Sequence, residues 1–151
     1  MRGLLRIVAG VAVVMALAAT PVSAQQAVPA GHVKTVSGTA TIVRDHGAAA
    51  AKAGDPIYAT DTLRTGADGS VGVTLRDDTR VSLGPNSEVK VDRYVYSPGE
   101  GGLGMVLKFI RGVSVYVSGR MAKLAPDAVR LEAPSGIVGV RGTTVAIRVG
   151  D

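Results

Sequence analysis

The sequence predicts an all-β fold of short antiparallel strands and stacked rungs, solenoid- or sandwich-like, behind a cleavable signal peptide. Three observations predict it. Apolar residues alternate with polar ones along much of the chain, turns rich in Gly, Asp and Pro separate these runs, and an apolar N-terminal stretch ends in small residues. Alternation places one face of a segment in a core and the other in water, as in half-buried strands.

The first 24 residues have the three parts of a signal peptide. Arg2 and Arg6 supply positive charge, residues 7–19 are apolar almost throughout, and Val22-Ser23-Ala24 offers small or compact side chains for cleavage. A transmembrane helix needs about 20 apolar residues, which is more than this run contains. We therefore expect cleavage near Ala24, secretion and no integral membrane span after cleavage.

The expected organisation is a signal peptide over residues 1–24, a flexible leader over 25–30 and one β domain over 31–151. Loss of Arg2 and Arg6 lowers the number of basic residues from 17 to 15 against 12 acidic residues, so the net charge falls from +5 to +3. This excess is spread along the chain, whereas nucleic-acid binders concentrate it on one face. We expect no nucleic-acid partner.

The alternating runs are short and closely spaced. Strands are expected around residues 71–75, 81–83, 89–91, 107–109, 113–117, 129–131 and 145–149, with turns at 67–70, 76–79, 84–87 and 134–136. Four further segments carry weaker signals. Arg111-Gly112 is expected to separate two strands, and residues 94–104 to run from a strand into a long mobile loop. Residues 47–53 fit a helix or a loop, and residues 121–127 fit one helical turn.

Histidines and carboxylates show no catalytic or metal-binding spacing. The chain has no cysteine, and His32 and His46 are its only histidines. They lack the i, i+4 spacing of a metal motif. Asp77 and Asp78 fall in a predicted turn, where adjacent side chains point in different directions. We interpret them as turn-forming residues and not as an acid–base pair.

One glycine pattern has the spacing of a nucleotide-binding motif but not its structural context. Gly99, Gly101 and Gly104 satisfy G-x-G-x-x-G. In a dinucleotide site these glycines open a helix whose N-terminus holds the pyrophosphate. Here they precede a run that alternates like a strand. We therefore expect no catalytic residues, no cofactor, no metal site and no enzymatic activity.

Three motifs follow one another between residues 54 and 143. They are Gly54-Asp55 with residues 61–70, the hairpin and turn over residues 71–89, and Ala133-Pro134 with residues 138–143. With these motifs the chain resembles the FecR domain family, the periplasmic domain of the iron-dicitrate transport regulator. The residues that carry the resemblance are Gly54, Asp55, Asp61, Thr65, Gly66, Gly69, Gly84, Ser87, Pro134, Gly139, Val140, Arg141, Gly142 and Thr143. We interpret them as structural, with Arg141 held against backbone carbonyls or an acidic partner.

The resemblance implies a non-catalytic module for protein interaction and regulation in the cell envelope, and it implies the periplasm as the place where the exported chain acts. Its implied role is signal transduction, and the implied partner is an envelope protein such as a receptor or sensor ectodomain. Full regulators of the family bind a sigma factor through a cytoplasmic segment. We do not expect that role of an exported chain.

An alternative function is binding of peptidoglycan or another polysaccharide. Tyrosines on a β surface can stack on sugar rings, and the chain has four: Tyr58, Tyr94, Tyr96 and Tyr116. The mild basic excess would also favour anionic envelope polymers.

Overall fold

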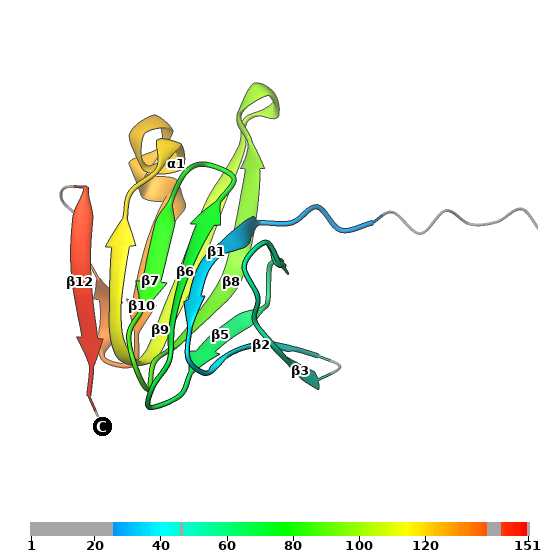
Figure 1. Ribbon diagram of the computed structural model, residues 1–151. Helices are drawn as coiled ribbons and strands as arrows, with labels where there is room; N and C mark the ends of the chain where they lie inside the picture. Colours follow the sequence, from blue (N-terminus) through cyan, green and yellow to red (C-terminus); the bar gives the residue numbers. More distant parts are fainter. Residues whose placement is uncertain (1–25, 46, 139–142, 151) are drawn as a thin grey trace, which may run out of the picture.

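The computed structural model describes residues 26–45, 47–138 and 143–150 (Figure 1). The expected signal peptide lies outside these residues. The strands are β1 (Gly31–Ser37), β2 (Ala40–Arg44), β3 (Gly47–Ala50), β4 (Pro56–Ile57), β5 (Thr62–Thr65), β6 (Ser70–Leu75), β7 (Arg80–Leu83), β8 (Glu88–Ser97), β9 (Gly102–Val117), β10 (Val129–Ala133), β11 (Gly136–Val138) and β12 (Thr144–Val149). The helical segments are η1 (Pro98–Glu100), α1 (Arg120–Leu124) and η2 (Pro126–Ala128).

One long strand, β9, organises the sheet. Its first part pairs with β8 antiparallel and with β10 parallel. Its last part pairs antiparallel with β7 on one side and β12 on the other. The sheet therefore has two halves that share β9 and curl around a common core (Figure 1). Half A contains β4, β1, β6, β7, residues 113–117 of β9 and β12; half B contains β3, β2, β5, β8, residues 102–111 of β9, β10 and β11.

The change from one half to the other occurs at Gly112. Its φ of 83° lies in the left-handed region that residues with a Cβ rarely adopt. A Cβ at this position would also run into the hydroxyl of Ser87. Gly112 therefore bends β9 without ending it. The expectation that Arg111-Gly112 separates two strands was wrong, because β9 continues through the bend as one strand while its pairing partners change.

The core between the halves is aliphatic, and it follows from the alternation. Val71, Val73 and Leu75 of β6 are buried, while Gly72 and Thr74 face outward. The same pattern in other strands buries Leu63, Val81, Leu83, Val89, Val91, Leu107 and Ile147. Burying one such side chain stabilises the fold by about 1.5–3 kcal/mol. The larger rings of Phe109 and Tyr116 are buried in the same core.

The expected all-β, mostly antiparallel fold is confirmed, and so are strands in all seven expected regions. The strands form a curled sheet in place of the stacked rungs of a solenoid. Residues 47–50 form β3, although helix or loop was expected there. Residues 94–104 do not form a long loop, because β8 continues to Ser97 and a single 3-10 turn leads into β9. The helical turn near residues 121–127 is confirmed by α1 and η2.

Candidate functional site

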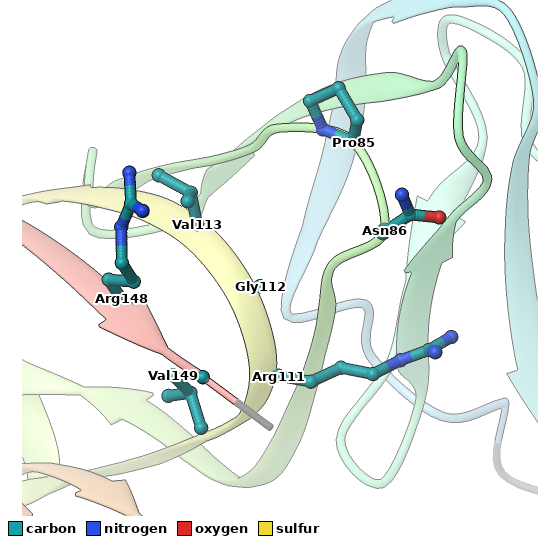
Figure 2. Close-up of a pocket in the computed structure, with 8 residues that line it drawn as sticks. Pro85, Asn86, Arg111, Gly112, Val113, Arg148 and Val149 are labelled. Atoms are coloured by element: carbon teal, nitrogen blue, oxygen red, sulfur yellow. The ribbon is translucent and has the colours of Figure 1, made fainter.

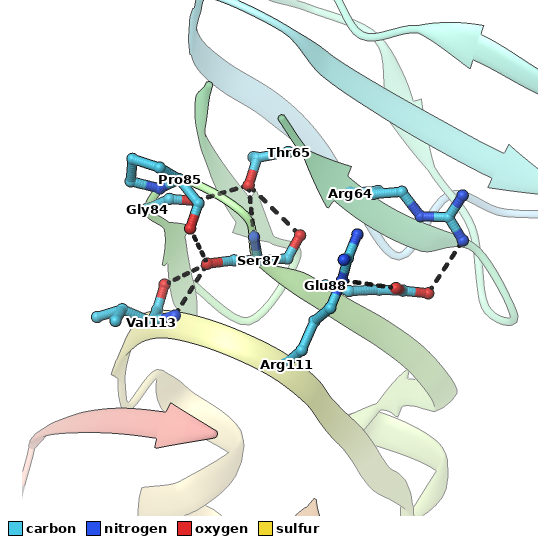
Figure 3. Close-up of polar contacts among 8 residues, drawn as sticks. All are labelled: Arg64, Thr65, Gly84, Pro85, Ser87, Glu88, Arg111 and Val113. Carbon is cyan, nitrogen blue, oxygen red and sulfur yellow. Dashed lines mark hydrogen bonds and ion pairs between the residues drawn. The ribbon is translucent and has the colours of Figure 1, made fainter. Parts of the chain in front are cut away.

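Several family-motif residues meet at one end of the sheet, next to the bend in β9 (Figure 3). Thr65, at the end of β5, is buried, and its hydroxyl donates to the carbonyl of Gly84 at 2.6 Å. The same hydroxyl accepts from the backbone N–H of Ser87 at 2.9 Å. The backbone N–H of Thr65 donates to the carbonyl of Ser87 at 2.9 Å. Thr65 therefore fixes the turn between β7 and β8.

Ser87 connects this turn to β9. Its fully buried hydroxyl accepts from the backbone N–H of Val113 at 2.9 Å and lies 3.0 Å from the carbonyl of the same residue. Val113 belongs to neither the β7 nor the β8 ladder, and its N–H on that side is bound by the Ser87 hydroxyl. A buried backbone group without a partner costs about 1–3 kcal/mol, so Ser87 compensates for the bend that Gly112 creates.

The glycines of the motifs complete the same corner. Gly66 donates to the carbonyl of Thr39 at 2.9 Å, and its own carbonyl accepts from Gly69 and from Asn86, each at 3.0 Å. Gly84 donates to the carbonyl of Val113 at 2.9 Å. The structure thus brings together five of the residues singled out in the sequence, namely Thr65, Gly66, Gly69, Gly84 and Ser87. Their contacts are with backbone groups.

Asp61 forms a second cluster, near β4. Its carboxylate is buried, and both of its oxygens lie 3.0 Å from Nε of Arg44. The backbone N–H of Tyr58 donates to Asp61 at 2.9 Å, and Arg44 also donates to the carbonyl of Pro56 at 2.7 Å. The Arg44 guanidinium stacks 5.0 Å from the centre of the Tyr58 ring. The planar guanidinium of arginine can donate several hydrogen bonds and stack on an aromatic ring at the same time.

Gly54 and Asp55 hold the preceding turn against β1. Asp55 accepts from the backbone N–H of Lys52 at 2.9 Å, which closes the turn. The N–H of Gly54 donates to the carbonyl of Val33 at 2.8 Å, and the N–H of Val33 donates to the carbonyl of Asp55 at 2.9 Å. These two motif residues serve as a connection between the loop and the sheet.

The last family motif is only partly described. Pro134 lies exposed in the turn between β10 and β11. Thr143 is exposed, and its carbonyl accepts from the backbone N–H of Ser118 at 2.7 Å. Gly139, Val140, Arg141 and Gly142 lie outside the described residues, so the role expected for Arg141 stays a prediction.

Asp77 is the centre of a buried hydrogen-bond network that the sequence pattern did not predict. It is fully buried, and its carboxylate accepts from the Thr79 hydroxyl at 2.7 Å, the Tyr94 hydroxyl at 2.9 Å and the backbone N–H of Met121 at 3.2 Å. Asp78 is exposed instead, so the two carboxylates do point apart as expected. The Asp-x-Thr spacing signals the local turn. The contacts with Tyr94 and Met121 have no sequence signal.

Tyr94 and Tyr116 are core residues. Only 8% of Tyr94 and none of Tyr116 is exposed. Burial raises the pKa of the Tyr94 hydroxyl above its ordinary value, and the charge of Asp77 raises it further. Burial is also the main cause that raises the pKa of Tyr116. These two rings are unavailable for stacking on sugars, which removes half of the tyrosines on which the polysaccharide alternative relied.

A hollow of about 470 Å³ lies beside the bend, lined in part by Asn86, Gly112, Arg111 and Arg148. Figure 2 shows the two arginine side chains pointing away from each other. Arg111 is also paired with Glu88, with Nε 3.3 Å from the carboxylate. The two cations therefore do not converge on one ligand.

Within the described part of the chain, no three His, Cys, Asp or Glu side chains lie close enough to hold a metal ion together. The same part contains no helix with the length and hydropathy needed to cross a bilayer. Five of the six buried Asp, Ser and Thr side chains that the structure describes bind turns and strand ends; they are Asp61, Thr65, Asp77, Thr79 and Ser87, and the sixth is Ser114. The hydrogen bonds of the described site residues thus go mainly to backbone groups of turns and strand ends.

Fold and site together define a small antiparallel β domain whose motif residues hold turns and strand ends. The family model described as FecR protein matches residues 61–151, so the chain belongs to the FecR family. The resemblance inferred from the sequence is thereby confirmed. Searches of curated proteins and of solved structures gave no match.

Proposed function

We propose that the chain is a non-catalytic module for protein interaction that acts in regulation in the cell envelope. Membership of the FecR family supports a regulatory, envelope-associated role. We further propose that the mature protein is periplasmic, with the signal peptide removed near Ala24. Recovery in the periplasmic fraction, with an N-terminus at Gln25, is the expected result; a chain that keeps residues 1–24 would contradict it.

The observation that carries the interaction role is the open edge of β3. Among residues 26–45, 47–138 and 143–150, this strand ends the sheet on one side and pairs with β2 alone, and all four of its residues are exposed (Figure 1). Edge strands are usually protected by charge, proline or shortness. Of the other edge strands, β4 has Pro56 and is two residues long, β11 is three residues long, and β12 carries Arg148, whereas β3 is the four-residue Gly-Ala-Ala-Ala.

The backbone direction along β3 follows from one hydrogen bond. The N–H of Ala51 donates to the carbonyl of Ala40 in β2 at 2.9 Å. Because these groups alternate along an antiparallel strand, Ala49 also faces β2, while Ala48 and Ala50 turn their N–H and C=O groups outward. An extended segment of a partner can add to this edge, and the small side chains let it approach closely.

The test is crosslinking in cells that make the protein, followed by purification and mass spectrometry. Ala50→Pro removes an outward N–H and leaves the pairing with β2 in place. Ala53→Pro is the control, since residue 53 follows the strand. We expect a reproducible protein partner with the wild type and the control, and its loss with Ala50→Pro. No reproducible partner, or equal recovery with Ala50→Pro, would contradict the proposal.

A further inference from the structure

The two halves of the sheet carry charge on their outer faces in different ways. On half B, most basic side chains are paired with a carboxylate. Glu88 lies between Arg64 (3.2 Å) and Arg111 (3.3 Å), as Figure 3 shows. Asp92 lies between Lys90 (3.7 Å) and Lys108 (3.5 Å). Among the basic residues of these strands, Arg93 is the exception, because it has no ion pair with a residue that the structure describes.

The outer face of half A is cationic. Its strands contain no Asp or Glu, and their basic residues are all exposed: His32, Lys34, Arg80 and Arg148. Lys34, Arg80 and Arg148 make no ion pair with any residue that the structure describes. The nearest acidic residue along β6–β7 is Asp78, which is already paired with Arg120 at 3.0 Å.

Two of these cations line one trough. A hollow of about 350 Å³ between β1, β6 and β7 is bordered by Lys34 and Arg80 and by three hydroxyl side chains, those of Thr35, Thr74 and Ser82. The strand register places Thr74 beside Arg80 and Gly72 beside Ser82. Charged and hydroxyl donors around one hollow suit a carboxylate, because hydrogen bonds to ionised groups are the stronger kind.

Gly72 keeps the trough open. A Cβ at this position would lie 2.6 Å from the hydroxyl oxygen of Thr35, so any larger residue would occupy the floor. A second hollow of about 520 Å³ continues along β1 and shares Lys34 and Thr74 with the first. It adds His32 and Arg76 to its lining, with Asp78 among its residues. The cationic surface is therefore a groove and not a single residue.

We propose that the outer face of half A docks an acidic protein surface, with carboxylates entering the trough between Lys34 and Arg80. The proposal rests on the interaction role above in that its partner is a protein, but the surface is separate from the β3 edge. Charge complementarity names the chemistry of the partner. A glycan is less well matched, because Tyr94 and Tyr116 are buried in the core and the strands of this face bring no other aromatic ring to it.

The probe is fluorescein-labelled poly-L-glutamate, titrated with the mature protein at low and physiological salt. The test variant is Lys34→Glu/Arg80→Glu. The matched control is Arg93→Glu/Lys123→Glu, which makes the same change in net charge at exposed positions on β8 and α1 that have no ion pair with a described residue. We expect about a 10-fold loss of affinity for the test variant and about 2-fold for the control, with binding weakened by salt.

Gly72→Val is a second variant, because it fills the trough without changing charge. It should weaken poly-L-glutamate binding while circular dichroism and thermal unfolding confirm the fold. Equal losses of poly-L-glutamate affinity for the test and control variants, or unchanged binding with Gly72→Val, would contradict the proposal that carboxylates bind in the trough. Tighter binding of polygalacturonate, or of phosphatidylglycerol vesicles, would overturn the assignment of a protein partner. Capture of a partner that depends on the β3 edge, together with any of these results, leaves the interaction role standing and rejects this surface.

Discussion

The hydroxyl of Tyr94 is bound on two sides by a single residue, Asp77. It donates to the Asp77 carboxylate at 2.9 Å and accepts from the backbone N–H of Asp77 at 3.0 Å. This pair joins the turn between β6 and β7 to β8, and both residues are buried. The carboxylate also accepts from the N–H of Met121, so the same residue positions the start of α1.

Tyr94→Phe should therefore destabilise the protein by about 1–3 kcal/mol, because it leaves a buried carboxylate and a buried N–H short of a partner. Urea unfolding measures the change. Tyr96→Phe is the control: Tyr96 lies two residues further along β8 and is only partly buried. Its change should stay within about 0.5 kcal/mol. Equal effects of the two substitutions would contradict the role of the Tyr94–Asp77 pair.

Alkaline pH should destabilise the fold. The pKa of Tyr94 is raised in the folded state by burial and by Asp77, so the folded state holds its proton more tightly than the unfolded state does. The resulting stability is fully present below about pH 10, the ordinary tyrosine pKa, and is lost as pH rises through the folded value. Tyr116 acts in the same direction.

The measurement is the free energy of unfolding between pH 8 and 11. It should be lower at pH 11 than at pH 9, and Tyr94→Phe should make the fall shallower by up to about 1.4 kcal/mol per pH unit. An unchanged slope in Tyr94→Phe would show that this hydroxyl ionises equally in both states.

Gly112→Ala should be strongly destabilising. The methyl group would meet Ser87 at a backbone φ of 83°, so both strain and overlap oppose it. We expect a loss of more than about 2 kcal/mol by thermal or urea unfolding. Gly99→Ala is the control, since a Cβ there meets no atom within 4 Å. A tolerated Gly112→Ala would refute the bend in β9 as described.

Arg44→Ala should cost about 2–4 kcal/mol, because it leaves the buried carboxylate of Asp61 without its cation. The Asp61 side chain is 3% exposed. Arg64→Ala removes an ion pair with Glu88, which keeps Arg111 as a second partner, so its cost should be about 0–1 kcal/mol. Unfolding of the two variants side by side measures the difference. A loss for Arg64→Ala as large as for Arg44→Ala would contradict it.

The β6–β7 hairpin shows what local sequence is sufficient to predict. Val71, Val73 and Leu75 alternate, and Asp77 and Thr79 provide the turn, so strand, turn and buried face all follow from neighbouring residues. The sequence did not predict β3, because Gly47–Ala50 shows no alternation of apolar and polar residues and contains no β-branched residue. It forms because β2 offers a ladder, which is a tertiary cause.

The continuity of β9 and the role of Asp77 depend on distant residues. The hydroxyl that binds the backbone at the bend comes from Ser87, 26 positions from Val113. Met121 lies 44 positions from Asp77. The family motifs identified Thr65 and Ser87 as structural residues, but their shared hydrogen bonds became visible only in the fold. The cationic face of half A likewise arises from β1, β7 and β12 together, and no single segment signals it.

The most direct test of the interaction role is site-specific photo-crosslinking in intact cells. The crosslinking amino acid p-benzoylphenylalanine would be placed at Ala49 on the β3 edge, at Ser82 on the outer face of half A, and at Arg130 on the outer face of half B. We predict discrete protein adducts from positions 49 and 82 and none from position 130. Absence of adducts from both 49 and 82, or equal adducts from all three positions, would contradict the account.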